Sequence, residues 1–297
     1  MRKNFSLLFL VAALAGAFNS MAQKTDSTAQ QPDRRKTNIF LITGGVVYGT
    51  SLLILNEMWY KGYPRGKFHF FNDNGEWYKL DKFGHAFCSY QITGGSYRAF
   101  SKSGYSKKWS LIASGITSFV VMTPIEWLDG YSIAYGASPG DVLANTVGYI
   151  LFAGQELVLN KQVVGIKYGF KTSTYAQFRP AVLGKNLGEQ MLKDYNGQTF
   201  WISLDLHGAI SEKIPPWLNL AFGYGADGMV FARPETNTEN GFSSFRQYYL
   251  SFDLDLTYIK TNKKVVKALL GAISMVHVPF PALEFSQNKL RSRWLAF

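Results

Sequence analysis

The sequence has few of the residues that disulfide-bonded proteins and common enzyme families need. Its only cysteine is Cys88, which excludes an internal disulfide and a cysteine metal site. Cys88 lies in an apolar stretch, where we expect a small core residue. No glycine-rich phosphate loop, serine nucleophile elbow or dense histidine cluster occurs in the chain. Enzymes that depend on those motifs are therefore not indicated.

Charged residues are also scarce. They make up 17% of the 297 residues, below the usual quarter, whereas aromatic residues reach 16%. This balance is typical of a membrane-associated protein. The formal net charge is +11, but the basic residues are scattered near the ends of apolar segments. Such a distribution favours contact with anionic lipid head groups.

The N-terminus predicts export. A basic pair and an apolar run are followed by Ser20 and Ala22, at the spacing of a signal-peptidase site. We therefore expect residues 1–22 to be a signal peptide, and the absence of a cysteine at its end excludes the lipoprotein route. Export also excludes nucleic acid as a partner and leaves membrane lipid as the expected one. Residues 23–37 are polar and predict a disordered linker.

The periodicity of apolar residues changes near residue 160. Before it, helices are expected at 38–59, 80–100, 108–127 and 139–160. The first helix has about 20 residues, enough to cross a bilayer, although a buried helix of a soluble bundle would also fit. The short connections predict that residues 38–160 form one four-helix domain.

Residues 161–297 alternate apolar and polar side chains, as antiparallel strands do. Strands are expected at 163–172, 199–206, 217–225, 247–259, 276–285 and 291–297, with helices at 184–195 and 262–274. In the fourth strand, Leu250 and Phe252 should lie on one face, with Ser251 and Asp253 on the other. The predicted fold class is α+β, with an N-terminal membrane-type four-helix bundle followed by a small antiparallel β-rich domain with one or two helices.

Polar residues concentrate within the predicted bundle, where they are costly unless paired or functional. Three helices each place two of them on one face, at spacings of three or four residues: Asp81 with His85, Glu126 with Asp129, and Asp141 with Asn145. Ser138 is the expected N-cap of the last helix, where Asp141 lies near the positive end of the dipole. One turn further along, the small Gly148 would permit close approach of another helix. The pattern predicts one shared polar site, although each residue alone could be a cap, a turn or a solvated position.

These motifs resemble two families. D-K-x-x-H on one helix, an acidic residue ending a second and D-x-x-x-N-x-x-G opening a third are similar to VanZ-like membrane proteins. The nearer resemblance, over about residues 38–158, is to bacterial envelope proteins of the domain of unknown function 2279 family, in which N-D-x-x-E-W precedes D-K-x-G-H. That motif adds Asp73, Glu76 and Lys82 to the site. The resemblance implies an envelope location and no established activity.

Three functions remain open: an envelope protein with a buried polar site, a hydrolase or transferase acting on a lipid or lipid-linked phosphate, and a structural assembly protein. In the enzyme, His85 would be nucleophile or general base and Lys82 an anion contact. The catalytic set would be His85, Asp81, Glu126 and Asp141, supported by Lys82, Asp129, Ser138, Asn145, Asp73 and Glu76. One histidine and several carboxylates are compatible with a divalent metal, although one histidine gives little support for zinc. The site would face the periplasm, at the inner or outer membrane.

Overall fold

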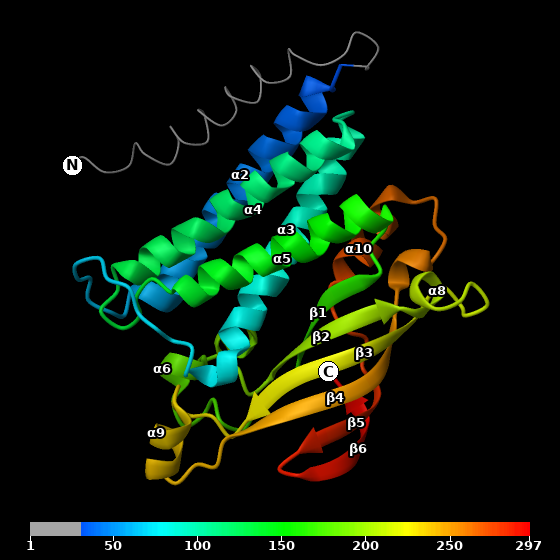
Figure 1. The fold of residues 1–297 in the computed structure, drawn as a ribbon. Helices are drawn as coiled ribbons and strands as arrows, with labels where there is room; N and C mark the ends of the chain where they lie inside the picture. The colour runs from blue at the N-terminus through cyan, green and yellow to red at the C-terminus, as the bar shows by residue number, and fades with distance from the viewer. Residues whose placement is uncertain (1–30) are drawn as a thin grey trace.

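The computed structural model describes residues 31–297, in which a helical layer packs on an antiparallel sheet (Figure 1). The predicted α+β fold is confirmed. The predicted signal peptide and the first part of the predicted linker lie outside the described residues.

Four long helices make up the helical layer. They are α2 (Arg34–Leu55), which a π-helix (Asn56–Tyr60) extends, α3 (Leu80–Lys102), α4 (Lys107–Gly130) and α5 (Pro139–Leu159). Helix α2 begins at Arg34 rather than at residue 38, because the Asp33 side chain accepts a hydrogen bond from the backbone N–H of Lys36. Residues 34–37 of the predicted linker are therefore helical.

Helix α3 is the centre of the layer and packs against α4, α5 and the first strands of the sheet. Its Tyr90 packs with Leu111 of α4 and Phe152 of α5 in a buried apolar cluster. At Gly148 the backbones of α5 and α3 approach so closely that a Cβ atom would lie 2.2 Å from the carbonyl oxygen of Ala86. The predicted close approach at Gly148 is confirmed.

Six strands form one meander in which each strand pairs with the next: β1 (Val164–Phe170), β2 (Gln198–Asp205), β3 (Leu218–Asp227), β4 (Phe245–Leu254), β5 (Phe280–Ser286) and β6 (Lys289–Ala296). Short helices connect them: α6 (Pro180–Leu183), α7 (Leu187–Lys193), α8 (Leu206–Ala209), α9 (Pro234–Glu239) and α10 (Lys264–Ile273). Strand β4 ends before the predicted residue 259, because Asp255 accepts the backbone N–H of Thr257 and starts a 3-10 turn.

The alternation predicted for β4 is present, and the polar face is the buried one. Ser251 and Asp253 are buried, whereas Leu250 and Phe252 are 40% and 45% exposed. The buried charge is paired, since Asp253 bonds Lys167 of β1. Helix α3 covers only part of the apolar face, where Phe83 stacks on Phe200 of β2. Much of that face is therefore left open.

Three helical stretches within the described residues are long and apolar enough to cross a membrane. They are Arg34–Tyr60, Lys107–Gly130 and Pro139–Leu159. Their exposed side chains include Ile42, Val46, Leu53, Leu143 and Val158. Length and composition are thus consistent with membrane association.

Candidate functional site

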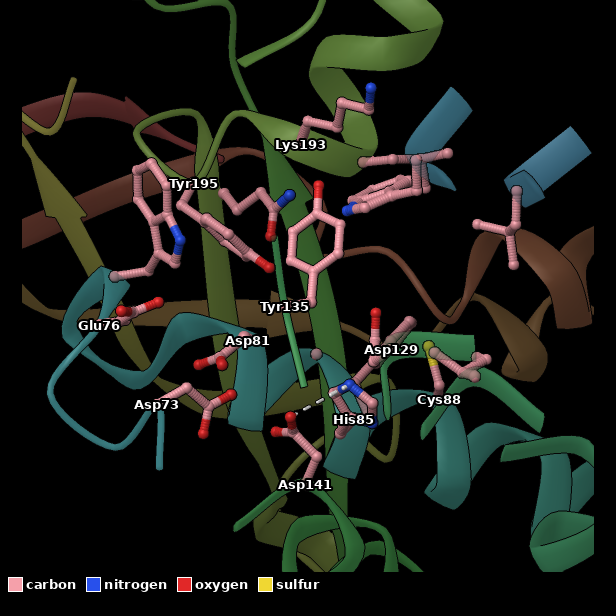
Figure 2. A pocket seen from close by; sticks show the side chains of 18 of the residues that line it. Asp73, Glu76, Asp81, His85, Cys88, Asp129, Tyr135, Asp141, Lys193 and Tyr195 are labelled. Carbon is pink, nitrogen blue, oxygen red and sulfur yellow. Dashed lines mark ion pairs between the residues drawn. The ribbon is translucent and has the colours of Figure 1, made fainter. Parts of the chain in front are cut away.

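A cavity of about 520 Å³ lies where the helical layer meets the sheet (Figure 2). Its apolar wall comes from both parts of the chain and includes Leu55, Trp59, Phe71, Phe87, Met122, Ile125, Val182, Met191, Leu192 and Phe200. Asp73, Asp81 and Asp141 gather beside His85 at one end of the cavity, and Tyr195 and Lys193 lie at the other. The cavity therefore has one acidic end and a largely apolar wall.

Lys82 is surrounded by three carboxylates at the acidic end. Its Nζ lies 2.6 Å from Asp73, 2.9 Å from Asp81 and 2.9 Å from Asp141. Burial opposes the charge on Lys82, yet these carboxylates raise its pKa above the ordinary value. Burial, opposed by Lys82, raises the pKa of Asp81 to about 7. The ammonium group thus faces carboxylates of its own chain.

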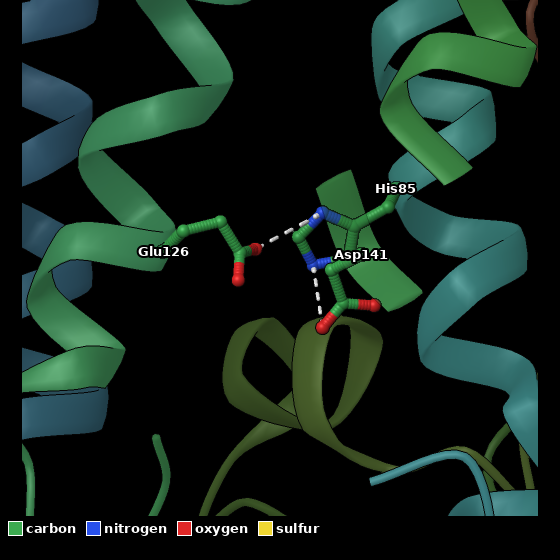
Figure 3. A group of neighbouring side chains, drawn as sticks. All are labelled: His85, Glu126 and Asp141. Carbon is green, nitrogen blue, oxygen red and sulfur yellow. Dashed lines mark ion pairs between the residues drawn. The ribbon is translucent and has the colours of Figure 1, made fainter. Parts of the chain in front are cut away.

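The His85 side chain lies between the Glu126 carboxylate and that of Asp141, which also contacts Lys82 (Figure 3). Its Nδ1 is 3.6 Å from Oε1 of Glu126 and 3.2 Å from Oδ1 of Asn145. Its Nε2 is 3.9 Å from Oδ2 of Asp141. The structure thus brings together residues from three helices that lie far apart in sequence.

Ser138 joins these two groups. It caps α5, because its Oγ accepts the backbone N–H of Asp141 at 3.2 Å. The same hydroxyl donates to Asp73 at 2.6 Å, and the backbone N–H of Ser138 donates to Oε2 of Glu126 at 3.1 Å. The predicted N-cap is confirmed and also orients two carboxylates.

An unusual backbone turn precedes the acidic end. Trp77, Tyr78 and Lys79 have φ angles of 45°, 51° and 66°, in the left-handed region that residues other than glycine rarely adopt. Tertiary bonds hold this turn, since the Trp77 N–H donates to Ala232 at 2.7 Å and the Tyr78 hydroxyl donates to Ser244 at 3.0 Å. The turn leads directly into α3 and so fixes the positions of Asp81 and Lys82 in the first turn of that helix. Strained backbone of this kind often occurs at functional sites.

Two predicted site residues have other partners. Asp129 lines the cavity, where its Oδ1 accepts the hydroxyl of Tyr60 at 2.9 Å. Glu76 also lines the cavity, and its carboxylate lies 3.3 Å from the exposed side chain of Arg233. Neither carboxylate contacts Lys82 or His85 in this structure.

The cavity also contains residues that the sequence analysis missed. Cys88, expected in the core, is exposed to the cavity instead, because α3 turns this position toward open space rather than toward a neighbouring helix. Lys193 is buried, which lowers its pKa, and its Nζ donates to the backbone carbonyl of Met58. No local pattern marks these residues, since strand and helix packing decides what they face.

Comparison with known families gives one match. Residues 69–153 match the family model DUF2279, described as a predicted periplasmic lipoprotein. The DUF2279 match confirms the predicted resemblance over these residues and contains every predicted polar-site residue, from Asp73 to Asn145. No curated protein and no solved structure matches the chain. The resemblance to VanZ-like proteins stays a prediction.

Proposed function

We propose that this protein is an exported, membrane-associated protein of the cell envelope that binds a lipid or similar amphiphile. The observation that supports this function is the cavity, whose volume of about 520 Å³ lies within the range of ligand sites. An acyl chain would pack against apolar residues such as Met191 and Leu192, and its head group would lie at the acidic end near His85. An amphiphile fits both regions, whereas a purely polar ligand would leave the apolar wall uncovered.

The apolar exterior supports a membrane location. Exposed apolar side chains occur on α2, α4 and α5, and also on the part of the apolar sheet face that α3 leaves open, where Phe222, Leu250 and Phe285 are 49%, 40% and 47% exposed. A large exposed apolar surface is unusual for a soluble monomer. The DUF2279 description as a predicted periplasmic lipoprotein supports an exported location.

Cys88 provides a direct test, because it is the only cysteine and faces the cavity. The full chain, purified in detergent, would be alkylated with iodoacetamide at increasing concentrations of dioctanoylglycerol, whose uncharged head group the carboxylates do not repel. We expect saturable slowing of alkylation by several-fold, measured by mass spectrometry. As a control, Thr238→Cys in a Cys88→Ser background offers an exposed thiol whose alkylation rate should not change. No slowing at Cys88, or equal slowing at both positions, would contradict the proposal.

A second candidate is a hydrolase or transferase acting on a lipid-linked phosphate. The observation in its favour is that His85 lines the cavity and lies between Asp141 and Glu126, an arrangement suited to a general base. In that case His85→Gln should abolish turnover of a lipid phosphate and leave the protection of Cys88 intact. Unchanged turnover in His85→Gln would reject this candidate.

A further inference from the structure

Three side chains at the acidic end offer donor atoms to a common point. His85 of α3, Glu126 of α4 and Asp141 of α5 each provide one atom, and these atoms lie within 4.8 Å of one another (Figure 3). Glu126 and Asp141 are buried, with 6% and 5% of their surface exposed. One imidazole and two carboxylates are a donor set that divalent transition metals accept.

Glu126 supplies an independent observation. Its Oε1 is fully buried, points toward His85 and has no hydrogen-bond partner among the described residues. A buried carboxylate oxygen without a donor is costly, and native proteins rarely keep one unless an ion or water satisfies it. His85 Nδ1, at 3.6 Å, is too far away for a hydrogen bond, and a bound cation would satisfy this oxygen.

In each of the three residues, one polar atom bonds a partner that orients the side chain, and a second polar atom remains available to bind an ion. Glu126 Oε2 accepts the backbone N–H of Ser138 at 3.1 Å, which leaves Oε1. Asp141 Oδ1 pairs with Lys82 at 2.9 Å, which leaves Oδ2. In the tautomer that donates from Nδ1 to Asn145, His85 keeps a lone pair on Nε2. Partners of this kind orient metal ligands in known sites.

We propose that His85, Glu126 and Asp141 bind one divalent transition-metal ion, such as Zn²⁺ or Mn²⁺. The three donor atoms lie within 4.8 Å of one another, and Nε2 of His85 is 3.9 Å from Oδ2 of Asp141, so the side chains would have to close around an ion with bonds of about 2.0–2.2 Å. The neighbouring group of Asp73, Asp81 and Asp141 needs no second ion, because the Lys82 ammonium already lies among its oxygens.

The ion would add anion recognition to the cavity. His85 and Asp141 line the cavity, so open coordination positions of the ion would face a bound ligand. Without a cation, the surplus of carboxylates at this end repels a phosphate. With one, a phosphate oxygen of the head group can complete the coordination. This role of the ion in head-group binding rests on the proposed function.

Metal binding by the full chain in detergent tests the site. The protein would be stripped with a chelator and titrated with ZnSO₄ or MnCl₂ by calorimetry, with metal content measured by mass spectrometry. We expect one equivalent in the natural protein and at least about a tenfold loss of affinity in Glu126→Gln. The matched control is Asp129→Asn, which removes a cavity carboxylate of the same helix that lies outside the proposed site, and its affinity should match that of the natural protein.

Melting temperatures separate a lost ligand from a lost fold. Metal should raise the melting temperature of the natural protein and of Asp129→Asn, but not that of Glu126→Gln. Metal-free Glu126→Gln should melt no lower than the metal-free natural protein, because glutamine can still accept the Ser138 N–H. No bound metal in the natural protein, or equal affinity in both variants, would overturn the inference. If lipid protects Cys88 but the protein binds no metal, the metal site is rejected and the proposed function stands. If the protein binds metal but lipid does not protect Cys88, only the proposed function is rejected.

Discussion

Replacing Gly148 with alanine would test whether the close contact of α3 and α5 assembles the polar site. A Cβ atom at this position would lie 2.2 Å from the Ala86 carbonyl oxygen and 3.0 Å from the Tyr90 nitrogen, whereas ordinary contacts begin at 3.4 Å. Both neighbouring atoms are backbone, so no side-chain rotation can relieve the clash. The two helices would have to separate by roughly 1 Å, the difference between these contacts.

Two opposing effects set the size of the loss. Overpacking of this kind costs about 1–3 kcal/mol. Alanine in a helix interior stabilises by about 1 kcal/mol relative to glycine. We therefore expect a net destabilisation of up to about 2 kcal/mol for Gly148→Ala. The separation should also move His85, one residue before Ala86, away from Asp141 and weaken metal binding.

Gly154→Ala is the matched control, because it lies on the same helix and a Cβ there would meet nothing within 4 Å. Thermal unfolding of both variants in detergent would be followed by circular dichroism. Gly154→Ala should melt at or above the temperature of the natural protein, and Gly148→Ala below it. Equal melting temperatures for the two variants would refute the close-contact argument.

Two further substitutions test the buried charges. Burial opposes ionisation of Asp253, but His277 and Lys167 lower its pKa from 3.8 to about 2, which amounts to about 2 kcal/mol of stability. Because the folded pKa is the lower one, this stability is present above about pH 4 and disappears as the pH falls toward 2. Asp253→Asn should lose it at neutral pH, and identical unfolding curves for Asp253→Asn and the exposed control Glu239→Gln would contradict this. Lys82→Gln should destabilise by about 3–5 kcal/mol, because one buried and two partly buried carboxylates lose their cation. Arg233→Gln, which breaks an exposed pair, should cost less than about 1 kcal/mol, and a similar loss in both lysine and arginine variants would count against the buried cluster.

Local signals explain what the sequence could predict. Ser138, Pro139 and Asp141 mark a helix start through bonds that span only three residues, and the structure contains that cap. The spacing of Asp141 and Asn145 places both on one helix face wherever the helix packs. Alternation along the strands likewise predicted their positions, because a period of two residues needs no tertiary partner.

Non-local contacts explain what the sequence could not predict. The pairing of Tyr60 with Asp129 joins segments 69 residues apart, so no spacing rule reveals it. The face that Cys88 presents depends on the space left between the helices and the sheet. The buried polar face of β4 depends on Lys167, since a charged partner on another strand is what makes burial of Asp253 acceptable. The two faces of a strand are predictable from its pattern, but the choice of the inner face is not.

The acidic end and the apolar wall of the cavity come from different parts of the chain. The residues of the acidic end lie within the DUF2279 match, whereas much of the apolar wall, including Leu55, Met191, Leu192 and Phe200, lies outside it. The head-group chemistry and the fit to the apolar part of a ligand therefore come from different parts of the chain. Substitutions at Met191 or Leu192 should change which amphiphile protects Cys88 without changing metal affinity. Substitutions at Glu126 should lower metal affinity without changing which amphiphile protects Cys88, for a ligand that binds through its apolar part. These two separate effects are expected only if the helical bundle and the sheet build one cavity.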